Sequence, residues 1–281
     1  TVINGKLEEP DFLSEVFDNF RPSKVVHLAA QAGVRHSIEF PRSYVETNLV
    51  GTFEVLEAAR NFKVEHLMMA STSSVYGGNS DMPFFENHKT EHQMSFYAAT
   101  KKANENMAHS YSHLYGIPVT MLRFFTVYGP WGRPDMALFK FVDAIRRDEP
   151  IDIYNNGKME RDFTYVGDLV EAIFKLSYCP PANVNAENRE INNGDSISPI
   201  APFRVVNIGN GVTVNLMDFI HEIENALGKS ARKKYLPMQP GDVGRTYASN
   251  ALLYDLTGYT PQTDVKQGIS AFTNWYNTYY S

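Results

Sequence analysis

A tyrosine and a lysine four positions apart, Tyr97 and Lys101, are the residues whose types and spacing most directly suggest catalysis. On a helix this spacing places both side chains on one face, with Cβ atoms about 5–6 Å apart. A free phenol has a pKa near ~10, and a neighbouring cation favours the phenolate, so such a pair can act as a base at neutral pH. The pattern is common by itself, and an ordinary helix surface is the alternative interpretation.

A run of hydroxyl side chains precedes that pair in the chain. Residues 71–74 read Ser-Thr-Ser-Ser and come directly after an apolar run at 66–70 that predicts a buried strand. The carboxyl ends of strands in an open parallel sheet are where ligands bind. The hydroxyls therefore either form a turn or line a site, and the later Tyr-x-x-x-Lys pattern favours a site.

A second strand end carries unusually small residues. Residues 27–33 read HLAAQAG, so that a predicted strand runs into alanines and a glycine. Small side chains let a flat cofactor approach the backbone closely. A tight turn between a strand and a loop is the other interpretation of this segment.

The elements that would position these residues alternate between strand and helix. Apolar runs predict strands at 24–29, 66–70 and 119–123, and amphipathic patterns predict helices at 11–20, 41–62 and 95–115. This alternation predicts a Rossmann-like, doubly wound parallel sheet with helices on both faces. The apolar face of the long helix at 41–62 is expected to consist of Val45, Leu49, Phe53, Leu56 and Ala59.

Shorter elements follow Gly129 and predict a smaller mixed α/β lobe that binds substrate. They are helices near 136–147, 167–177, 215–227 and 265–280, strands at 151–154 and 203–208, and a loop at 180–202. We therefore expect residues 1–129 to form the cofactor-binding domain. Residues 130–281 are expected to form mainly the substrate lobe, with some segments returning to the first domain.

Composition excludes several classes of function. The 281 residues hold 26 Lys and Arg against 32 Asp and Glu, a net charge of −6. The chain therefore lacks the excess of basic residues that would predict binding to nucleic acid. No apolar run approaches the roughly 18 residues of a membrane span. The single Cys179 predicts a reducing, cytoplasmic environment. His109 and His113 lack the intervening Glu and the third ligand of a zinc motif, so we expect no metal.

Several longer segments together identify a family. The chain carries YVETNLVGT at 44–52, RFFTVYGP at 123–130, RDFTYV at 161–166 and QPGDV at 239–243. With the strand-end hydroxyls and the Tyr-Lys pair, it resembles the extended short-chain dehydrogenase/reductases, specifically the NAD-dependent nucleotide-sugar epimerases and dehydratases. The resemblance implies a catalytic triad of Thr72, Tyr97 and Lys101 around a bound NAD.

The resemblance also implies which residues bind cofactor and substrate. The expected NAD contacts are Leu7, Leu28, Ala29, Ala30, Gln31, Asn48, Tyr97, Lys101 and Phe125. The expected substrate contacts are Arg35, Thr72, Ser73, Thr126, Arg133, Tyr154 and Arg161, with Arg161 assigned to the diphosphate. Lys6, His36 and Asn250 depart from the usual family residues, and Lys6 is expected to alter the adenine contacts.

The positions after Thr72 indicate the reaction. Dehydratases of the family carry Asp-Glu there, and UDP-glucuronate decarboxylases carry Glu at the second position, whereas this chain has Ser73 and Ser74. Once dehydration and decarboxylation are set aside, epimerisation is the reaction of the family that remains. Thr126, where UDP-galactose 4-epimerases carry Asn, resembles the UDP-glucuronate 4-epimerase branch. The alternatives are an epimerase of neutral UDP-hexoses, a UDP-glucuronate C5-epimerase and a non-catalytic dinucleotide-binding protein.

The resemblance implies a mechanism in which carbon 4 of the sugar is oxidised to a ketone, the sugar rotates, and the ketone is reduced from its other face. Tyr97 would act as the base, Lys101 would lower the pKa of Tyr97, and Thr72 would hydrogen-bond the reacting oxygen. The helices at 41–62 and 95–115 are expected to pair with a second copy in a homodimer. No Gly-rich pyrophosphate turn is present and residues 1–5 resemble the family's third strand, so we expect that an N-terminal βαβ unit is missing and that NAD binding is weak.

Overall fold

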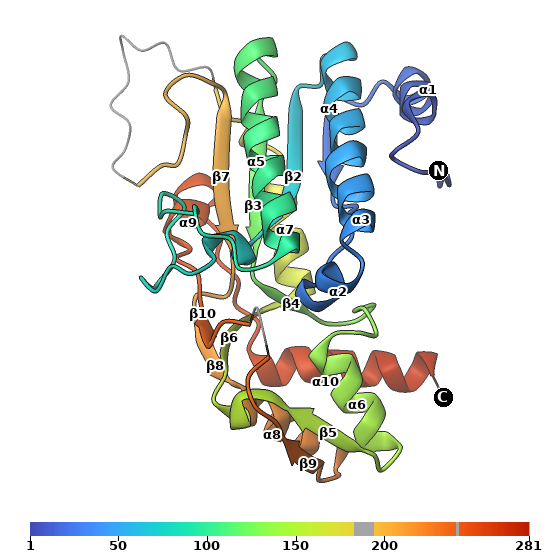
Figure 1. Ribbon diagram of the computed structural model, residues 1–281, viewed down its shortest axis with the longest axis vertical. Coiled ribbons are helices and arrows are strands. Elements are labelled where there is room, and N and C mark those ends of the chain that lie inside the picture. Colours follow the sequence, from blue (N-terminus) through green and yellow to red (C-terminus); the bar gives the residue numbers. More distant parts are fainter. Residues whose placement is uncertain (183–193, 240–241, 281) are drawn as a thin grey trace.

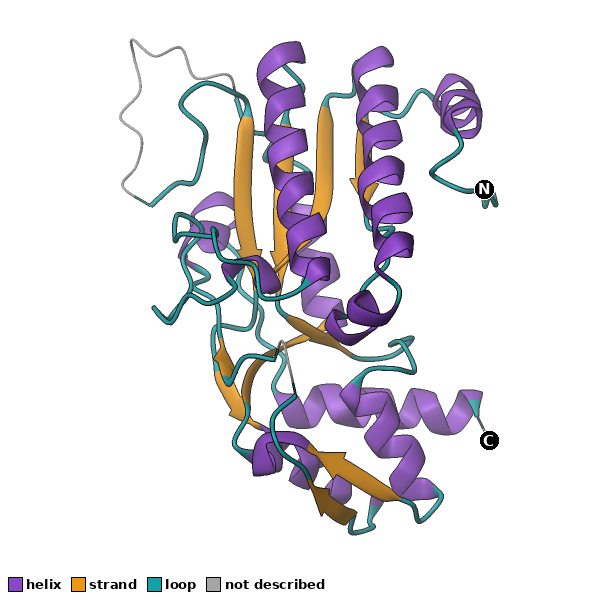
Figure 2. Cartoon of the chain, viewed as in Figure 1, coloured by secondary structure: helices purple, strands orange, loops and turns teal. Residues whose placement is uncertain are grey.

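The computed structural model describes residues 1–182, 194–239 and 242–280. Its central sheet has the order β1-β2-β3-β7 and is parallel throughout, as Figures 1 and 2 show. The strands are β1 (Lys24–His27), β2 (His66–Thr72), β3 (Val119–Phe124) and β7 (Phe203–Ile208). Because all four run in the same direction, their carboxyl ends lie at one edge of the sheet.

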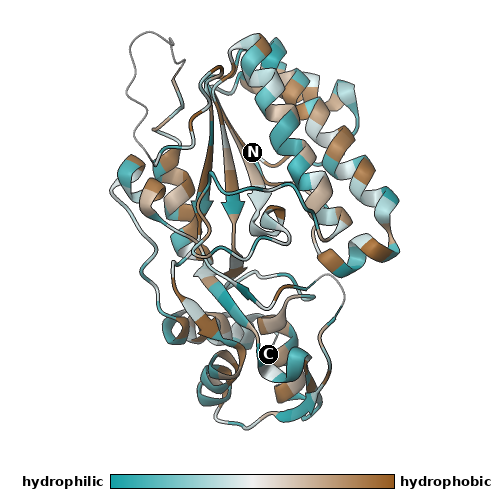
Figure 3. Cartoon of the chain, turned by 60° about the vertical axis from the view of Figure 1, so that its left-hand side comes forward, coloured by the Kyte–Doolittle hydropathy of each residue, from teal (hydrophilic) through white to brown (hydrophobic). Residues whose placement is uncertain are grey.

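Helices bury both faces of this sheet, so the predicted doubly wound class is confirmed. On one face, α1 (Pro10–Phe20), α4 (Thr52–Asn61) and α5 (Phe96–Tyr115) pack on a core that includes Met69 and Met121. On the other face, α7 (Val166–Leu176) and α9 (Ala251–Thr257) pack on a core that includes Met68 and Leu122. Figure 3 shows the apolar strands enclosed between the helices.

The helix expected at 41–62 is helical from end to end but is not one regular α-helix. It consists of α3 (Pro41–Tyr44), a π-helical segment η1 (Val45–Gly51) and α4. The predicted apolar face divides between the core and the surface. Leu56 and Ala59 are buried, whereas Val45 is 38% and Phe53 41% exposed.

A second lobe lies beyond the carboxyl edge of the sheet (Figure 1). Its core, which includes Phe141, Ile153, Phe219 and Phe272, lies among α6 (Ala137–Arg146), α8 (Leu216–Leu227), α10 (Val265–Tyr279) and their strands. Those strands are β4 (Thr126–Tyr128), β5 (Pro150–Ile153), β6 (Glu160–Tyr165), β8 (Thr213–Asn215), β9 (Arg232–Tyr235) and β10 (Arg245–Thr246). They form a mixed sheet β10-β6-β4 with β8 on β6, and a pair β5-β9.

Three short segments complete the connections: α2 (Val34–Glu39), η2 (Ser73–Tyr76) and η3 (Tyr154–Gly157). Residues 180–182 and 194–202 of the predicted loop contain no helix or strand, and 183–193 lie outside the described residues. The strand expected at residues 1–5 is not present. Residues 1–6 are exposed, and β1 pairs only with β2 in the described part of the chain, so no neighbouring strand supplies the hydrogen bonds that a strand needs.

Candidate active site

A cleft of about 1540 Å³ separates the carboxyl edge of the central sheet from the second lobe. Its lining includes ten of the residues predicted for the site: Gln31, Arg35, Thr72, Ser73, Tyr97, Phe125, Thr126, Arg133, Tyr154 and Arg161. The other predicted residues, Leu7, Leu28, Ala29, Ala30, Asn48 and Lys101, do not line it. The structure therefore brings the expected substrate residues together in one cavity.

Thr72 is placed by the transition from β2 to η2. It is the last residue of β2, and its side-chain oxygen accepts a hydrogen bond from the backbone N–H of Ser74 at 3.2 Å, which caps η2. This bond fixes the hydroxyl at the strand end. Ser73 follows on the cleft side and is partly exposed.

Tyr97 and Lys101 are placed by the first turns of α5. The Ser95 side chain accepts a hydrogen bond from the backbone N–H of Ala98 at 3.1 Å, which caps the helix, and Gly116 ends it in the left-handed conformation at φ 68°. Both boundaries match the prediction. Tyr97 is partly exposed in the cleft wall, whereas Lys101 is 3% exposed.

Burial controls the protonation of both groups. It raises the pKa of Tyr97, and a hydrogen bond with Thr72 and the positive charge of Arg133 oppose that rise. Burial lowers the pKa of Lys101 to about 8, and the carboxylate of Glu105 opposes that shift. The expectation that Lys101 lowers the pKa of Tyr97 is therefore not met in this structure. Thr72 and Arg133 are the groups that act to lower it.

Asn48 holds the segment that follows β1. Its side chain accepts a hydrogen bond from the backbone N–H of Gln31 at 2.8 Å, donates to the Gln31 carbonyl at 3.0 Å and donates to Thr100 on α5 at 3.0 Å. Asn48 is fully buried in the π-helical segment η1. It acts on the cleft through the backbone of Gln31, and Leu7 packs against the core beside Gly51.

Three arginines, which we call the arginine wall, line the same cleft as Thr72 and Tyr97: Arg35, Arg133 and Arg161. The guanidinium of Arg35 lies 4.7 Å from the ring centroid of Tyr154 and 3.6 Å from the Asp242 carboxylate. Arg133 donates to the Ala32 carbonyl at 3.1 Å. Arg161 donates to the carbonyl of Glu160 at 3.0 Å and of Gly244 at 3.1 Å. Arginine forks suit carboxylates and phosphates, so this wall suits an anionic ligand.

Sequence reasoning missed several residues around the cleft. Tyr76 and Phe84 stack at 4.3 Å and line it, and Asp242 is the ion-pair partner of Arg35. The carboxylate of Glu105 bonds Ser71 and Arg123 behind the triad. Only Glu105 had a readable signal, because it follows Lys101 by the same spacing of four that relates Lys101 to Tyr97.

Two features are absent from the described residues. No group of three or more His, Cys, Asp or Glu side chains in that part of the chain is arranged to hold a metal ion. Within the same ranges, no helix is both long and apolar enough to span a membrane.

Comparisons with known proteins agree with the geometry of the cleft. The model of the NAD dependent epimerase/dehydratase family matches residues 1–188. A protein from Rhizobium meliloti named "Probable UDP-glucuronate 4-epimerase" is 52% identical over 278 residues, which cover 99% of this chain and 81% of that protein.

Solved structures resemble the chain over nearly its whole length. The UDP-glucuronic acid 4-epimerase from Bacillus cereus, in complex with UDP-glucuronic acid and NAD, has a TM-score of 0.84 at 31% identity and covers 98% of this chain and 81% of its own. MoeE5, in complex with the same two ligands, has a TM-score of 0.83 at 32% identity over 98% of this chain and 85% of its own.

Proposed function

Because the chain belongs to the NAD-dependent epimerase/dehydratase family, we propose that it interconverts UDP-glucuronate and UDP-galacturonate by inverting carbon 4 of the sugar. The observation that carries the proposal is the cleft that Thr72 and Tyr97 line together with three arginines. Those arginines match the charge of a nucleotide diphosphate and a uronic acid.

The residues at the carboxyl end of β1 fit NAD. Leu28 is apolar and 52% exposed, the alanines after it leave the backbone open to a flat ring, and Asn48 holds the backbone of Gln31. The ammonium donors of Lys101 suit ribose hydroxyls as acceptors. We assign cofactor binding to Leu7, Leu28, Ala29, Ala30, Gln31, Asn48, Tyr97, Lys101 and Phe125. When bound, NAD supplies the acceptor and donor of hydride at carbon 4.

The chain's own residues move the proton and hold the sugar. Tyr97 removes the proton of the 4-hydroxyl during oxidation and returns one during reduction, so it ends unchanged. The Thr72 hydroxyl hydrogen-bonds the reacting oxygen. Arg161 binds the diphosphate, Arg35 and Arg133 bind the diphosphate or the sugar, and Tyr154 contacts the uracil. Ser73 and Thr126 place hydroxyls in the same cleft to hold the sugar carboxylate.

The test is incubation of the full-length protein with UDP-glucuronate and NAD in deuterated water, with products resolved by chromatography and NMR. We expect UDP-galacturonate without deuterium at carbon 5. Deuterium at carbon 5 would indicate a C5-epimerase, and turnover of UDP-glucose alone would indicate an epimerase of neutral hexoses. If none of these substrates is converted, the catalytic proposal is wrong and a non-catalytic dinucleotide-binding role takes its place.

We propose that the protein is a homodimer that pairs through α3, η1, α4 and α5. Val45, Val50 and Phe53 are large apolar side chains of this face and are 38%, 41% and 41% exposed. An exposed apolar stripe on adjacent helices suits a second copy of the chain. Sedimentation of the wild type and of Phe53→Glu tests this, because a dimer should dissociate in the variant, whereas a monomeric wild type contradicts the proposal.

Two further expectations remain proposals. A cytoplasmic location is supported by the free Cys179, and cell fractionation tests it. The division into a cofactor-binding domain at 1–129 and a substrate lobe at 130–281 is supported by the separate cores of the two lobes, with β7, α7 and α9 returning to the first. Limited proteolysis that cuts near residue 130 under native conditions would support this boundary.

A further inference from the structure

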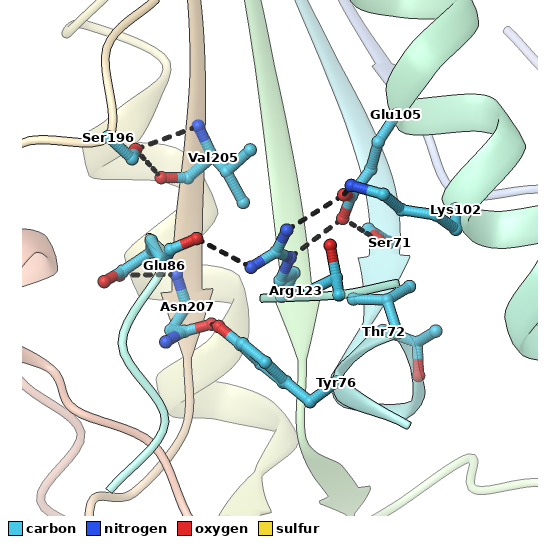
Figure 4. Close-up of polar contacts among 12 residues, drawn as sticks. Ser71, Thr72, Tyr76, Glu86, Lys102, Glu105, Arg123, Ser196, Val205 and Asn207 are labelled. Carbon is cyan, nitrogen blue, oxygen red and sulfur yellow. Dashed lines mark hydrogen bonds and ion pairs between the residues drawn. The ribbon is translucent and has the colours of Figure 1, made fainter. Parts of the chain in front are cut away.

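A buried carboxylate lies directly behind the triad. Glu105 follows Lys101 on α5 by four residues, as Lys101 follows Tyr97, so the three side chains share one face of the helix. Glu105 is 2% exposed. Its carboxylate accepts hydrogen bonds from Arg123 Nε at 2.8 Å, Arg123 Nη2 at 2.9 Å and Ser71 Oγ at 2.7 Å (Figure 4). Lys102 Nζ adds a fourth donor at 3.1 Å.

The two buried partners come from the strands that carry the rest of the site. Ser71 on β2 immediately precedes Thr72 and lies opposite Arg123 in the pairing of β2 with β3. Arg123 also donates to the backbone carbonyl of Glu86 at 2.9 Å, and its guanidinium lies 4.8 Å from the ring centroid of Tyr76, which lines the cleft. The Glu105 carboxylate therefore ties the helix of Tyr97 to the strand end of Thr72 (Figure 4).

Stability alone does not explain this ion pair. Removing two charges from water costs as much as their attraction returns, and apolar side chains of similar volume often serve a core equally well. The bidentate geometry fixes the orientation of the Glu105 carboxylate, because two parallel N–H donors and one hydroxyl hold it in one plane. The same negative charge acts on Lys101 one turn away and opposes the loss of its proton.

We propose that Glu105 is a positioning residue for the epimerase reaction: through Arg123 and Ser71 it fixes α5 against β2, so that Tyr97 and Lys101 stay aligned with Thr72. This inference rests on the proposed function. Because a misplacement of about 1 Å can cost on the order of 10²-fold in rate, loss of this alignment should lower kcat. The arginines assigned to the substrate bond other partners and not Glu105, Arg123 or Ser71, so KM should change little.

The test compares Glu105→Gln with Asp195→Asn in the full-length protein. Asp195 accepts two hydrogen bonds from the buried Arg204, at 3.0 and 3.1 Å, in a second bidentate pair that is partly buried. That pair lies near the amino end of β7, away from the cleft, so its loss controls for destabilisation alone. We expect Glu105→Gln to lower kcat about 10- to 100-fold with KM within about twofold of wild type. Asp195→Asn should lower the unfolding temperature with kcat unchanged.

A second readout does not depend on turnover. Competitive acetylation of Lys101, followed by mass spectrometry across pH, reports its pKa. Glu105→Gln should shift the acetylation profile of Lys101, and the alkaline limb of the kcat profile, to lower pH because the lysine loses its stabilising anion. If Glu105→Gln does not fold, Ser71→Ala removes one hydrogen bond of the carboxylate and should lower kcat in the same direction by a smaller factor.

The outcomes separate the inference from the proposed function. A wild type that converts no UDP-sugar overturns the function, whereas the acetylation profile still tests the action of Glu105 on Lys101. Wild-type kcat and an unshifted Lys101 profile in Glu105→Gln overturn the positioning role, as does an equal fall of kcat in Asp195→Asn.

Discussion

Thr72 and Tyr97 line the same cleft as the arginine wall, but the triad and the wall are held in different ways. Behind the triad, Ser71, Glu105 and Arg123 are buried and joined by hydrogen bonds of 2.7 to 2.9 Å, and the buried Asn48 bonds the backbone of Gln31 at 2.8 and 3.0 Å. In the wall, Arg35 and Arg133 have side chains 50% and 45% exposed. Their partners are surface carboxylates and carbonyls, which an anionic ligand can replace. Groups that must keep their alignment are fixed by the core, and groups that must exchange partners are left near water.

Substitution within the triad should have the largest effect. Tyr97→Phe keeps the ring and removes the group that exchanges the proton, so kcat should fall by about 10²- to 10⁴-fold. The unfolding temperature should stay close to that of wild type, because the substitution keeps the ring and removes one hydroxyl. Product formation from UDP-glucuronate and a thermal melt measure the two quantities. Activity within a few-fold of wild type would remove Tyr97 from the mechanism.

Substitution in the arginine wall should separate binding from chemistry. Arg161→Met removes a cation from the cleft, and hydrogen bonds to charged groups contribute about 1.5–3 kcal/mol, so KM should rise about 10- to 100-fold with kcat largely retained. Initial rates across substrate concentrations measure both constants. Arg60→Met, which removes a surface partner of Glu57, is the matched control and should leave both unchanged. A fall in kcat alone would mean that Arg161 acts on the reacting atoms.

Loss of a buried hydrogen-bonding side chain should lower the free energy of unfolding. Asn48→Ala leaves the N–H and carbonyl of Gln31 without their side-chain partner, and the free energy of unfolding should drop by about 2–3 kcal/mol. Urea unfolding measures it. Asn79→Ala, whose side chain accepts one exposed hydrogen bond from Asp81, should lose less than about 1 kcal/mol. Equal losses in the two variants would contradict the contrast between buried and exposed support.

Acid should weaken the sheet before it weakens the arginine wall. Burial lowers the pKa of His66 from 6.5 to about 4, so the folded state binds this proton less readily than the unfolded chain. The resulting stability is present above pH 6.5 and is lost as pH falls towards 4.

Comparison of the wild type with His66→Gln isolates this contribution from those of His27 and Glu86, which also titrate. The advantage of the wild type should shrink by about 1 kcal/mol per pH unit below pH 6.5. Urea unfolding at several pH values measures this advantage, and a constant difference would contradict the burial of a neutral His66.

Local signals predicted much of this arrangement. The cap Ser95 and the stop Gly116 marked both ends of α5, and the apolar runs marked β2 and β3, because those features depend on neighbours in sequence. The π-helical turn of η1 was not predictable in the same way. Asn48 in that turn bonds Gln31 and Thr100, and only the folded chain brings these residues together.

The same contrast between local motifs and contacts made only in the folded chain applies to the site. The family motifs predicted Thr72, Tyr97 and Lys101 as members of one triad. The sequence did not show that Glu105 pairs with Arg123 or that Arg35 pairs with Asp242. Arg123 lies on the next strand and Asp242 lies in the other lobe, so only the folded chain brings these partners together. The protonation of Tyr97 was also mispredicted, since burial outweighs the charges around the phenol.

The position of β7 has a consequence for how the protein is made. This strand pairs with β3 but is encoded after β4, β5 and β6 of the other lobe. During synthesis, β1, β2 and β3 therefore leave the ribosome before β7, and the β3 edge of the sheet stays open until β4, β5 and β6 have also been made. The nascent protein cannot complete either lobe independently, so both should form and be lost in one cooperative step.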